Sequence, residues 1–108
     1  LHRAGPDPRR ELRKQTRLTK QEIAEIDERL DLLDRASRHG TWTRPILQII
    51  ARKAGTPAAE LALGFGREKR RLRADIRKLK ELGLTRSLRV GYELSPRGEA
   101  YLEAIRSR

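Results

Sequence analysis

The sequence contains no cysteine, so it can form neither a disulfide framework nor a thiolate-ligated metal site. Its two histidines, His2 and His39, have no metal-ligand spacing, and no nucleophile motif accompanies them. We therefore expect no metal, no cofactor and no enzymatic activity. The apolar runs are shorter than a membrane span, and no secretory signal pattern is visible. These absences favour a cytoplasmic protein without a membrane partner.

Aromatic residues are also scarce, at 4% of the chain. This scarcity removes the stacking platform on which single-stranded nucleic acids are usually bound. Methionine is absent and the sequence starts with Leu1. The sequence therefore leaves open that the chain is part of a larger protein.

Positive charge is abundant, with a net charge of +11 over 108 residues. Such a charge favours a polyanionic partner, and nucleic acid is the first candidate. The charge is unevenly distributed, which divides the chain into three parts. Residues 1–18 carry six basic and two acidic side chains, residues 19–40 carry four and six, and residues 41–108 carry sixteen and seven.

Residues 1–18 contain Gly5, Pro6 and Pro8 beside several arginines, which predicts a flexible basic arm. Residues 19–40 predict one helix, because Thr19 and Glu22 have the spacing of a capping box. An apolar stripe follows this helix at 3-4-3 spacing, formed by Ile23, Ile26, Leu30 and Leu33. Leu32 and Ala36 lie on the opposite side of the helix.

Two apolar faces on one helix indicate two neighbours. The stripe of Ile23, Ile26, Leu30 and Leu33 is a candidate homodimer interface. Packing of the stripe against its own chain is the equally weighted alternative.

Residues 41–108 predict a compact helical domain with a small hairpin. Thr43 and Pro45 mark a helix start, with Trp42 as a hydrophobic staple or core residue, and Thr56 is predicted to cap a second, short helix. The elements expected are a helix from Thr43 to Gly55, a short helix ending at Gly66, a basic helix over 67–82, a hairpin over 84–94 and a last helix capped by Ser95.

The basic helix carries the main functional signal. At about 100° per residue, Leu72, Ile76 and Leu79 fall on one face and predict the core side. The remaining surface is dominated by arginine and lysine, which must then point outward. Any single arginine can be an ordinary solvated charge, but the cluster favours contact with nucleic acid.

Three stretches resemble the winged helix-turn-helix family, and most closely its MarR, PadR and ArsR-type bacterial regulators. These stretches are Ala58-Ala59-Glu60-Leu61-Ala62, Leu79-Lys80-Glu81-Leu82-Gly83-Leu84 and Leu94-Ser95-Pro96-Arg97-Gly98-Glu99. The resemblance implies a mainly α fold with a small β-hairpin wing and an extra N-terminal helix. It further implies sequence-specific binding of double-stranded DNA by a dimeric transcriptional regulator, with repression the favoured mode.

The resemblance also implies residue roles, with 67–82 as the recognition helix in the major groove and 84–94 as a wing on the backbone. Base contacts fall to Arg70, Arg73, Ala74 and Arg77. Phosphate contacts fall to Arg67, Lys69, Arg71, Lys78, Arg86, Arg89, Thr43 and Thr56.

Two alternatives stay open on the sequence alone. One is a DNA-binding module of a larger replication, nuclease, phage or plasmid protein. The other is a winged helix that binds protein or RNA, which the density of basic residues in the recognition helix disfavours. Nothing in the sequence identifies a small-molecule effector, a DNA target or a regulated gene.

Overall fold

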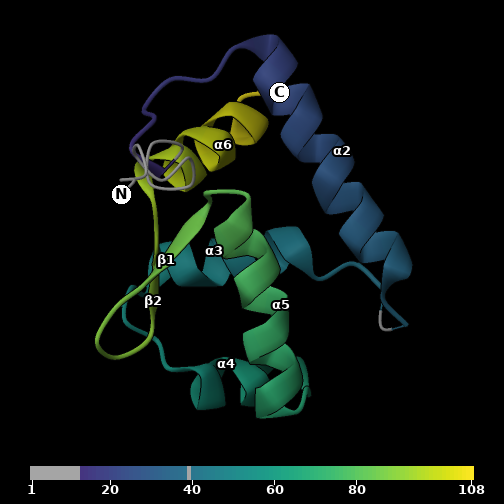
Figure 1. The fold of residues 1–108 in the computed structure, drawn as a ribbon, viewed down its shortest axis with the longest axis vertical. Helices are drawn as coiled ribbons and strands as arrows, with labels where there is room; N and C mark the ends of the chain where they lie inside the picture. Colours follow the sequence, from purple (N-terminus) through teal and green to yellow (C-terminus); the bar gives the residue numbers. More distant parts are fainter. Residues whose placement is uncertain (1–12, 39) are drawn as a thin grey trace, which may run out of the picture.

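The computed structural model describes residues 13–38 and 40–108. Within these residues the chain forms five helices and one antiparallel hairpin, arranged around a single core (Figure 1). The elements are α2 (Lys20–Ala36), α3 (Thr43–Arg52), α4 (Ala58–Phe65), α5 (Lys69–Glu81), β1 (Thr85–Ser87), β2 (Tyr92–Leu94) and α6 (Pro96–Arg106). The predicted class, mainly helical with a small hairpin, is confirmed.

Helix α2 begins with the predicted capping box. The Thr19 hydroxyl accepts from the Glu22 amide at 3.1 Å, and the Glu22 carboxylate accepts from the Thr19 amide at 2.8 Å. The predicted dimer stripe, however, faces the chain's own core. Ile26 and Leu30 are 2% and 0% exposed, and the part-buried Ile23 and Leu33 pack against the same core.

Of the predicted dimer residues Ile23, Ile26, Leu30 and Leu33, the two buried ones, Ile26 and Leu30, are therefore not available to a second chain, because the other helices already cover them. The structure favours packing of the stripe within its own chain, and a homodimer stays a prediction. The large apolar residue that α2 leaves exposed is Leu32, at 48%. Residues 1–12 of the predicted arm lie outside the described residues, whereas its end is attached to the fold. Leu18 packs against the core, and Gln15 bonds to Glu22 at 2.7 Å.

Helix α3 is capped by a side chain from α2. Asp34 accepts hydrogen bonds from the amides of Trp42 and Thr43 at 2.9 and 3.0 Å, and from the Thr43 hydroxyl at 2.9 Å. These bonds satisfy donors that a helix start otherwise leaves free. The predicted helix start at Thr43 is confirmed, and the Thr43 side chain is fully buried.

Helices α4 and α5 meet at a tight turn. Gly66 adopts the left-handed conformation with φ +61°, and the Arg67 amide donates to the Ala62 carbonyl at 2.9 Å. The predicted cap at Thr56 is wrong, because its hydroxyl donates backward to the Lys53 carbonyl at 2.6 Å and Pro57 occupies the cap position. In α5 the predicted apolar face is confirmed: Leu72, Ile76 and Leu79 are buried.

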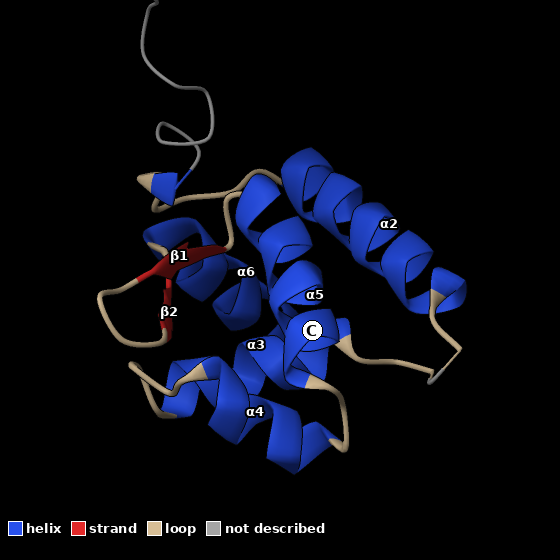
Figure 2. Cartoon of the chain, turned by 60° about the horizontal axis from the view of Figure 1, so that its bottom comes forward, coloured by secondary structure: helices blue, strands red, loops and turns tan. Residues whose placement is uncertain are grey.

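The hairpin joins α5 to α6. Thr85 pairs with Leu94, Arg86 with Glu93, and Ser87 with Tyr92. Ser95 then caps α6 by accepting from the Gly98 amide at 3.0 Å, as predicted. Figure 2 shows the hairpin extending from the helical body on the same side as the start of α4.

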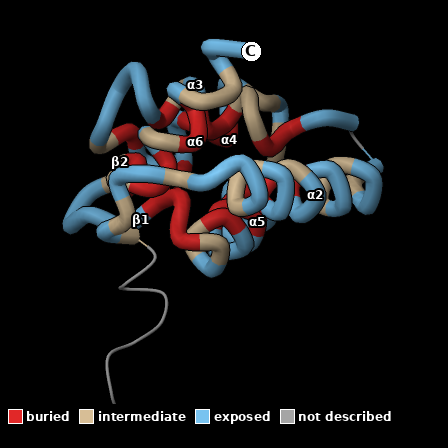
Figure 3. Tube along the Cα trace, turned by 90° about the horizontal axis from the view of Figure 1, so that it is seen from above, coloured by how far each residue is buried: buried red, intermediate tan, exposed pale blue. Residues whose placement is uncertain are grey.

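The core lies where α3, α5 and α6 come together, and Figure 3 shows the buried segments gathered there with α2 exposed along its outer side. Trp42 is 2% exposed and belongs to this core, as one of its two predicted roles requires. None of the described helices has the length and hydropathy to cross a bilayer.

Candidate nucleic-acid interface

Helix α5 presents a basic surface because its core face fixes the orientation of all its other side chains. Leu72, Ile76 and Leu79 hold one face inward, so the helix has no freedom to turn its cations away from solvent. The four residues predicted to face bases are all exposed and line one shallow hollow with Glu68 and Lys69. These four are Arg70, Arg73, Ala74 and Arg77.

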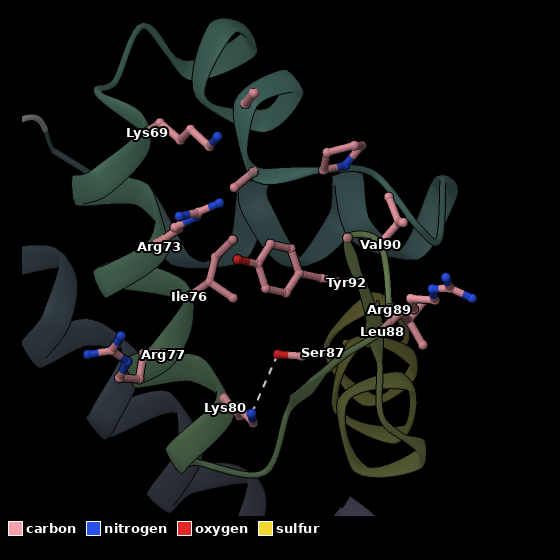
Figure 4. Close-up of a pocket in the computed structure, with 14 residues that line it drawn as sticks. Lys69, Arg73, Ile76, Arg77, Lys80, Ser87, Leu88, Arg89, Val90 and Tyr92 are labelled. Atoms are coloured by element: carbon pink, nitrogen blue, oxygen red, sulfur yellow. Dashed lines mark hydrogen bonds between the residues drawn. The ribbon is translucent and has the colours of Figure 1, made fainter.

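A larger groove lies between α5, the hairpin and the start of α4. It encloses about 580 Å³ and is open to solvent. Its cationic lining residues are Lys69, Arg73, Arg77, Lys80 and Arg89. No acidic side chain lines it, and Ile76 and Tyr92 lie between α5 and the hairpin on its apolar side (Figure 4).

The hairpin wall of this groove is fixed by main-chain contacts. The Gly55 amide donates to the Tyr92 carbonyl at 2.8 Å, and Thr56 forms an isolated antiparallel bridge with Tyr92. Gly91 has φ +80°, and a Cβ at this position would lie 2.3 Å from the Gly55 carbonyl oxygen. The segment before α4 and the hairpin therefore touch backbone to backbone, which sets the width of the groove.

Among the described residues, the cations of the groove form no intramolecular ion pair. Across residues 13–38 and 40–108, no carboxylate lies within 4.0 Å of the charged groups of Lys69, Arg73, Arg77, Lys80 or Arg89. Lys80 donates to the Ser87 hydroxyl at 3.4 Å, which links α5 to β1. A concentration of unpaired positive charge on a fixed surface is suited to binding a polyanion.

Two predicted phosphate residues lie outside this groove and near carboxylates. Arg86 forms an ion pair with Glu93 across the hairpin at 2.5 Å, and its side chain is 47% exposed. Lys78 is 54% exposed and lies 4.0 Å from Asp75 on the other flank of α5. Arg71 is exposed and does not line the groove. Of the predicted phosphate residues, the groove therefore brings together Lys69 and Arg89.

Three other phosphate predictions are wrong because the side chains are buried. The Arg67 side chain is 5% exposed, since it forms an ion pair with Asp75 and lies 5.5 Å from the Trp42 ring centroid. Thr43 is 0% exposed and bonded to Asp34, and Thr56 is 4% exposed and bonded to the Lys53 carbonyl. These groups stabilise the fold and are not available to an external phosphate.

Sequence reasoning also missed two groups that line the groove, Lys80 and Ser87. Lys80 lies three residues after Arg77 and seven after Arg73, which places all three on adjacent rows of the helix. That spacing was a usable signal for Lys80. No local sequence pattern indicates that Ser87 lines the groove. Its position depends on the hairpin turn that brings β1 alongside α5.

The described residues contain no group of three or more histidine or acidic side chains placed to hold a metal ion. Comparisons with family models, curated proteins and solved structures found no match for this chain. What this surface binds must therefore be argued from its own geometry and charge.

Proposed function

We propose that this chain binds double-stranded DNA as a winged helix-turn-helix transcriptional regulator, with α5 in the major groove and the hairpin on the sugar–phosphate backbone. The order α3, α4, tight turn, α5, hairpin agrees with that architecture. The observation that carries the proposal is the groove between α5 and the hairpin, which five cations line without any acidic side chain.

The positions of the cations support two roles. Arg70, Arg73 and Arg77 are exposed on the face of α5 opposite its buried stripe, which is the face that a major groove would receive. Arginine pairs with guanine through two parallel hydrogen bonds, so these side chains suit base reading. Lys69, Lys80 and Arg89 lie at the ends and sides of the groove and suit the phosphates that flank the reading helix.

The test is selection of a preferred duplex from a random library, followed by fluorescence anisotropy with the selected duplex and a scrambled one. We expect tight, saturable binding to the selected duplex. Arg77→Ala should relax the choice of one base pair at a cost of about 1–3 kcal/mol, whereas Arg89→Ala should weaken all duplexes about equally.

Arg29→Ala is the matched control, because Arg29 is exposed on α2 and lines none of the described hollows. It removes one positive charge and should leave the sequence preference unchanged. Equal binding of every duplex by the wild-type chain would contradict sequence-specific regulation. Equal losses from Arg77→Ala and Arg89→Ala on all sequences would contradict the division of roles.

A second candidate is a DNA-binding module that docks as a single copy within a larger protein. One observation favours it: the α2 stripe that was predicted to join two copies packs against the chain's own core. Both candidates use the same groove and differ in stoichiometry. A plateau at two chains per selected duplex supports the dimeric regulator, and a plateau at one chain supports the module.

A further inference from the structure

A second basic hollow lies beside β1 and is not used in the function proposed above. It measures about 280 Å³ and is lined by Arg13, Lys14, Lys80, Arg86 and Ser87. Its residues come from three parts of the chain: the segment before α2, the end of α5 and strand β1. No acidic side chain lines it.

The groove between α5 and the hairpin adjoins this second hollow. Lys80 and Ser87 line both, and the bond between Lys80 Nζ and Ser87 Oγ crosses from α5 to β1 at their boundary. An extended anion that lies in the first groove therefore meets the second hollow without leaving the basic surface. A small free anion can occupy only one of the two hollows, so it gains no affinity from their adjacency. A polymeric phosphate backbone can contact both and gains affinity from each.

The charge of the second hollow depends on its N-terminal residues. Arg86 is paired with Glu93, so this pair contributes little net charge. Lys80 is shared with the first groove. The positive charge that belongs to this hollow alone comes from Arg13 and Lys14, for which no carboxylate lies within 4.0 Å among the described residues.

Arg13 and Lys14 are held in place by the next residues of the chain. Gln15 donates to Glu22 on α2 at 2.7 Å and accepts from Arg97 on α6. Arg97 also donates to the Leu82 carbonyl at 3.0 Å, next to the start of the hairpin, and Leu18 packs against the core. The segment is therefore attached at two points, which places the backbone of Arg13 and Lys14 beside the hollow before any ligand arrives and lowers the entropic cost of binding.

We propose that Arg13 and Lys14 form a second phosphate-binding site that holds the backbone of the same DNA duplex, on the far side of Lys80 and Ser87 from the first groove. The site rests on the proposed function, since its ligand is the continuation of the duplex bound by α5. It extends the contact beyond the hairpin and adds affinity without reading sequence.

The experiment measures how duplex affinity depends on salt for the wild-type chain and for Arg13→Gln/Lys14→Gln. Each phosphate contact adds about 0.9 to the slope of log K against log salt. Losing two contacts should lower that slope by roughly 1.8, so the variant should lose about twelvefold less affinity than the wild type between 50 and 200 mM salt. The preferred sequence should not change.

Arg29→Ala/Arg35→Ala is the charge-matched control. Both arginines are exposed on the C-terminal half of α2, which lies across the molecule from the hairpin (Figures 1 and 2). The control should keep the wild-type slope. Glutamine keeps much of the aliphatic chain at both positions, and unchanged circular dichroism and melting temperature confirm that the variants fold.

The outcomes separate the two proposals. If the wild-type chain binds duplexes and Arg13→Gln/Lys14→Gln keeps its slope, the second site is overturned and the first groove stands. An equal decrease in slope for both double variants also overturns the site, because the effect then follows net charge and not position. If the wild-type chain binds no duplex, both proposals fail.

Discussion

Arg67 connects three parts of the chain that are distant in sequence. It forms an ion pair with Asp75 within α5, donates to the Ser37 hydroxyl at 3.2 Å beyond the end of α2, and lies over the Trp42 ring. The Arg67 and Asp75 side chains are 5% and 8% exposed. The turn before α5 is thus tied to the junction of α2 and α3, which fixes where the basic helix begins.

Removing one partner of this pair should be costly. Asp75→Ala leaves a buried guanidinium without its counter-charge, and we expect a loss of about 3–5 kcal/mol in the free energy of unfolding. Urea denaturation measures the loss. Arg67→Met/Asp75→Leu should recover most of it, because an apolar pair needs no desolvation of charge. If Asp75→Ala lowers the free energy of unfolding by less than about 1 kcal/mol, water reaches Arg67 and the ion pair does not hold the turn in place.

Asp27 forms the centre of a second network, between α2, α3 and α6. Its carboxylate accepts from Arg44 at 3.1 Å, from Arg108 at 2.8 Å and from the Tyr101 hydroxyl. Burial alone would raise the pKa of Asp27, but hydrogen bonds from Arg108, Tyr101 and Arg44 outweigh it and lower the pKa to about 2. Burial also raises the pKa of Tyr101 to about 12.

Stability should therefore fall in acid. Because the folded-state pKa of Asp27 lies below its ordinary value of 3.8, its contribution is present above about pH 4 and lost as the pH falls towards 2. We expect a loss on the order of 1–2 kcal/mol from this group. Urea unfolding at pH 5 and pH 2 measures the change, and Asp27→Asn should lose less than the wild type. An equal loss in both proteins would assign the acid sensitivity to other carboxylates.

The sequence predicted contacts between residues close together in the chain, but not contacts between distant ones. The capping box of Thr19 and Glu22 and the cap by Ser95 depend on residues three apart, and both were predicted correctly. Thr43, Thr56 and Arg67 were read as surface groups because their local patterns resemble helix starts or a basic helix. Each is buried by a contact with another element or loop, and a one-dimensional pattern does not encode such contacts.

At the scale of elements, periodicity predicted which face of α5 is buried but not what stands opposite its exposed face. The groove exists because β2 pairs with the segment before α4 through Thr56 and Gly55. The hairpin itself was predicted, with strands one or two residues longer than those observed. Its attachment to the α3–α4 loop was not, because Gly55 and Pro57 indicate a turn at Thr56 but not the distant strand with which that turn pairs.

Gly91→Ala should loosen this attachment. The new Cβ would lie 2.3 Å from the Gly55 carbonyl oxygen, at a residue with φ +80°, so both the clash and the backbone conformation oppose it. Gly66→Ala is the matched control, because Gly66 has φ +61° with open space around its Cβ position.

The control should cost about 1–2 kcal/mol from backbone strain alone. Gly91→Ala should cost more and should speed hydrogen exchange at the Gly55 amide, whose acceptor is the Tyr92 carbonyl. Urea denaturation and amide exchange measure the two effects. Equal costs for both variants, with unchanged exchange at Gly55, would mean that the hairpin is positioned by side chains instead.

At the scale of the whole molecule, α2 belongs to the same core as the rest of the fold. Leu30→Ala removes a fully buried side chain and should lower the free energy of unfolding by about 2–5 kcal/mol. Sedimentation of the folded variant should give the same mass as the wild type. A wild-type dimer that Leu30→Ala dissociates without loss of stability would show that the stripe joins two copies in solution.

The charges are also segregated across the molecule. Arg44 makes ion pairs with Asp27, Asp31 and Asp34, so three of the acidic side chains of α2 are occupied at the α2–α3 junction. On α5 and the hairpin, five cations have no carboxylate within 4.0 Å among the described residues: Lys69, Arg73, Arg77, Lys80 and Arg89. A dipolar charge distribution of this kind orients a molecule as it approaches a polyanion and raises the rate of association.

The backbone contact between Gly55 and Tyr92 has a consequence for how this surface can evolve. The width of the groove is set by main-chain atoms, whereas its cations are contributed by exposed side chains that carry no structural ion pair among the described residues. Point mutations can therefore change the charge and polarity of the side chains that line the groove, while the main-chain contact keeps its width the same. A lineage built on this scaffold can change the chemistry of this surface without first having to repair its fold.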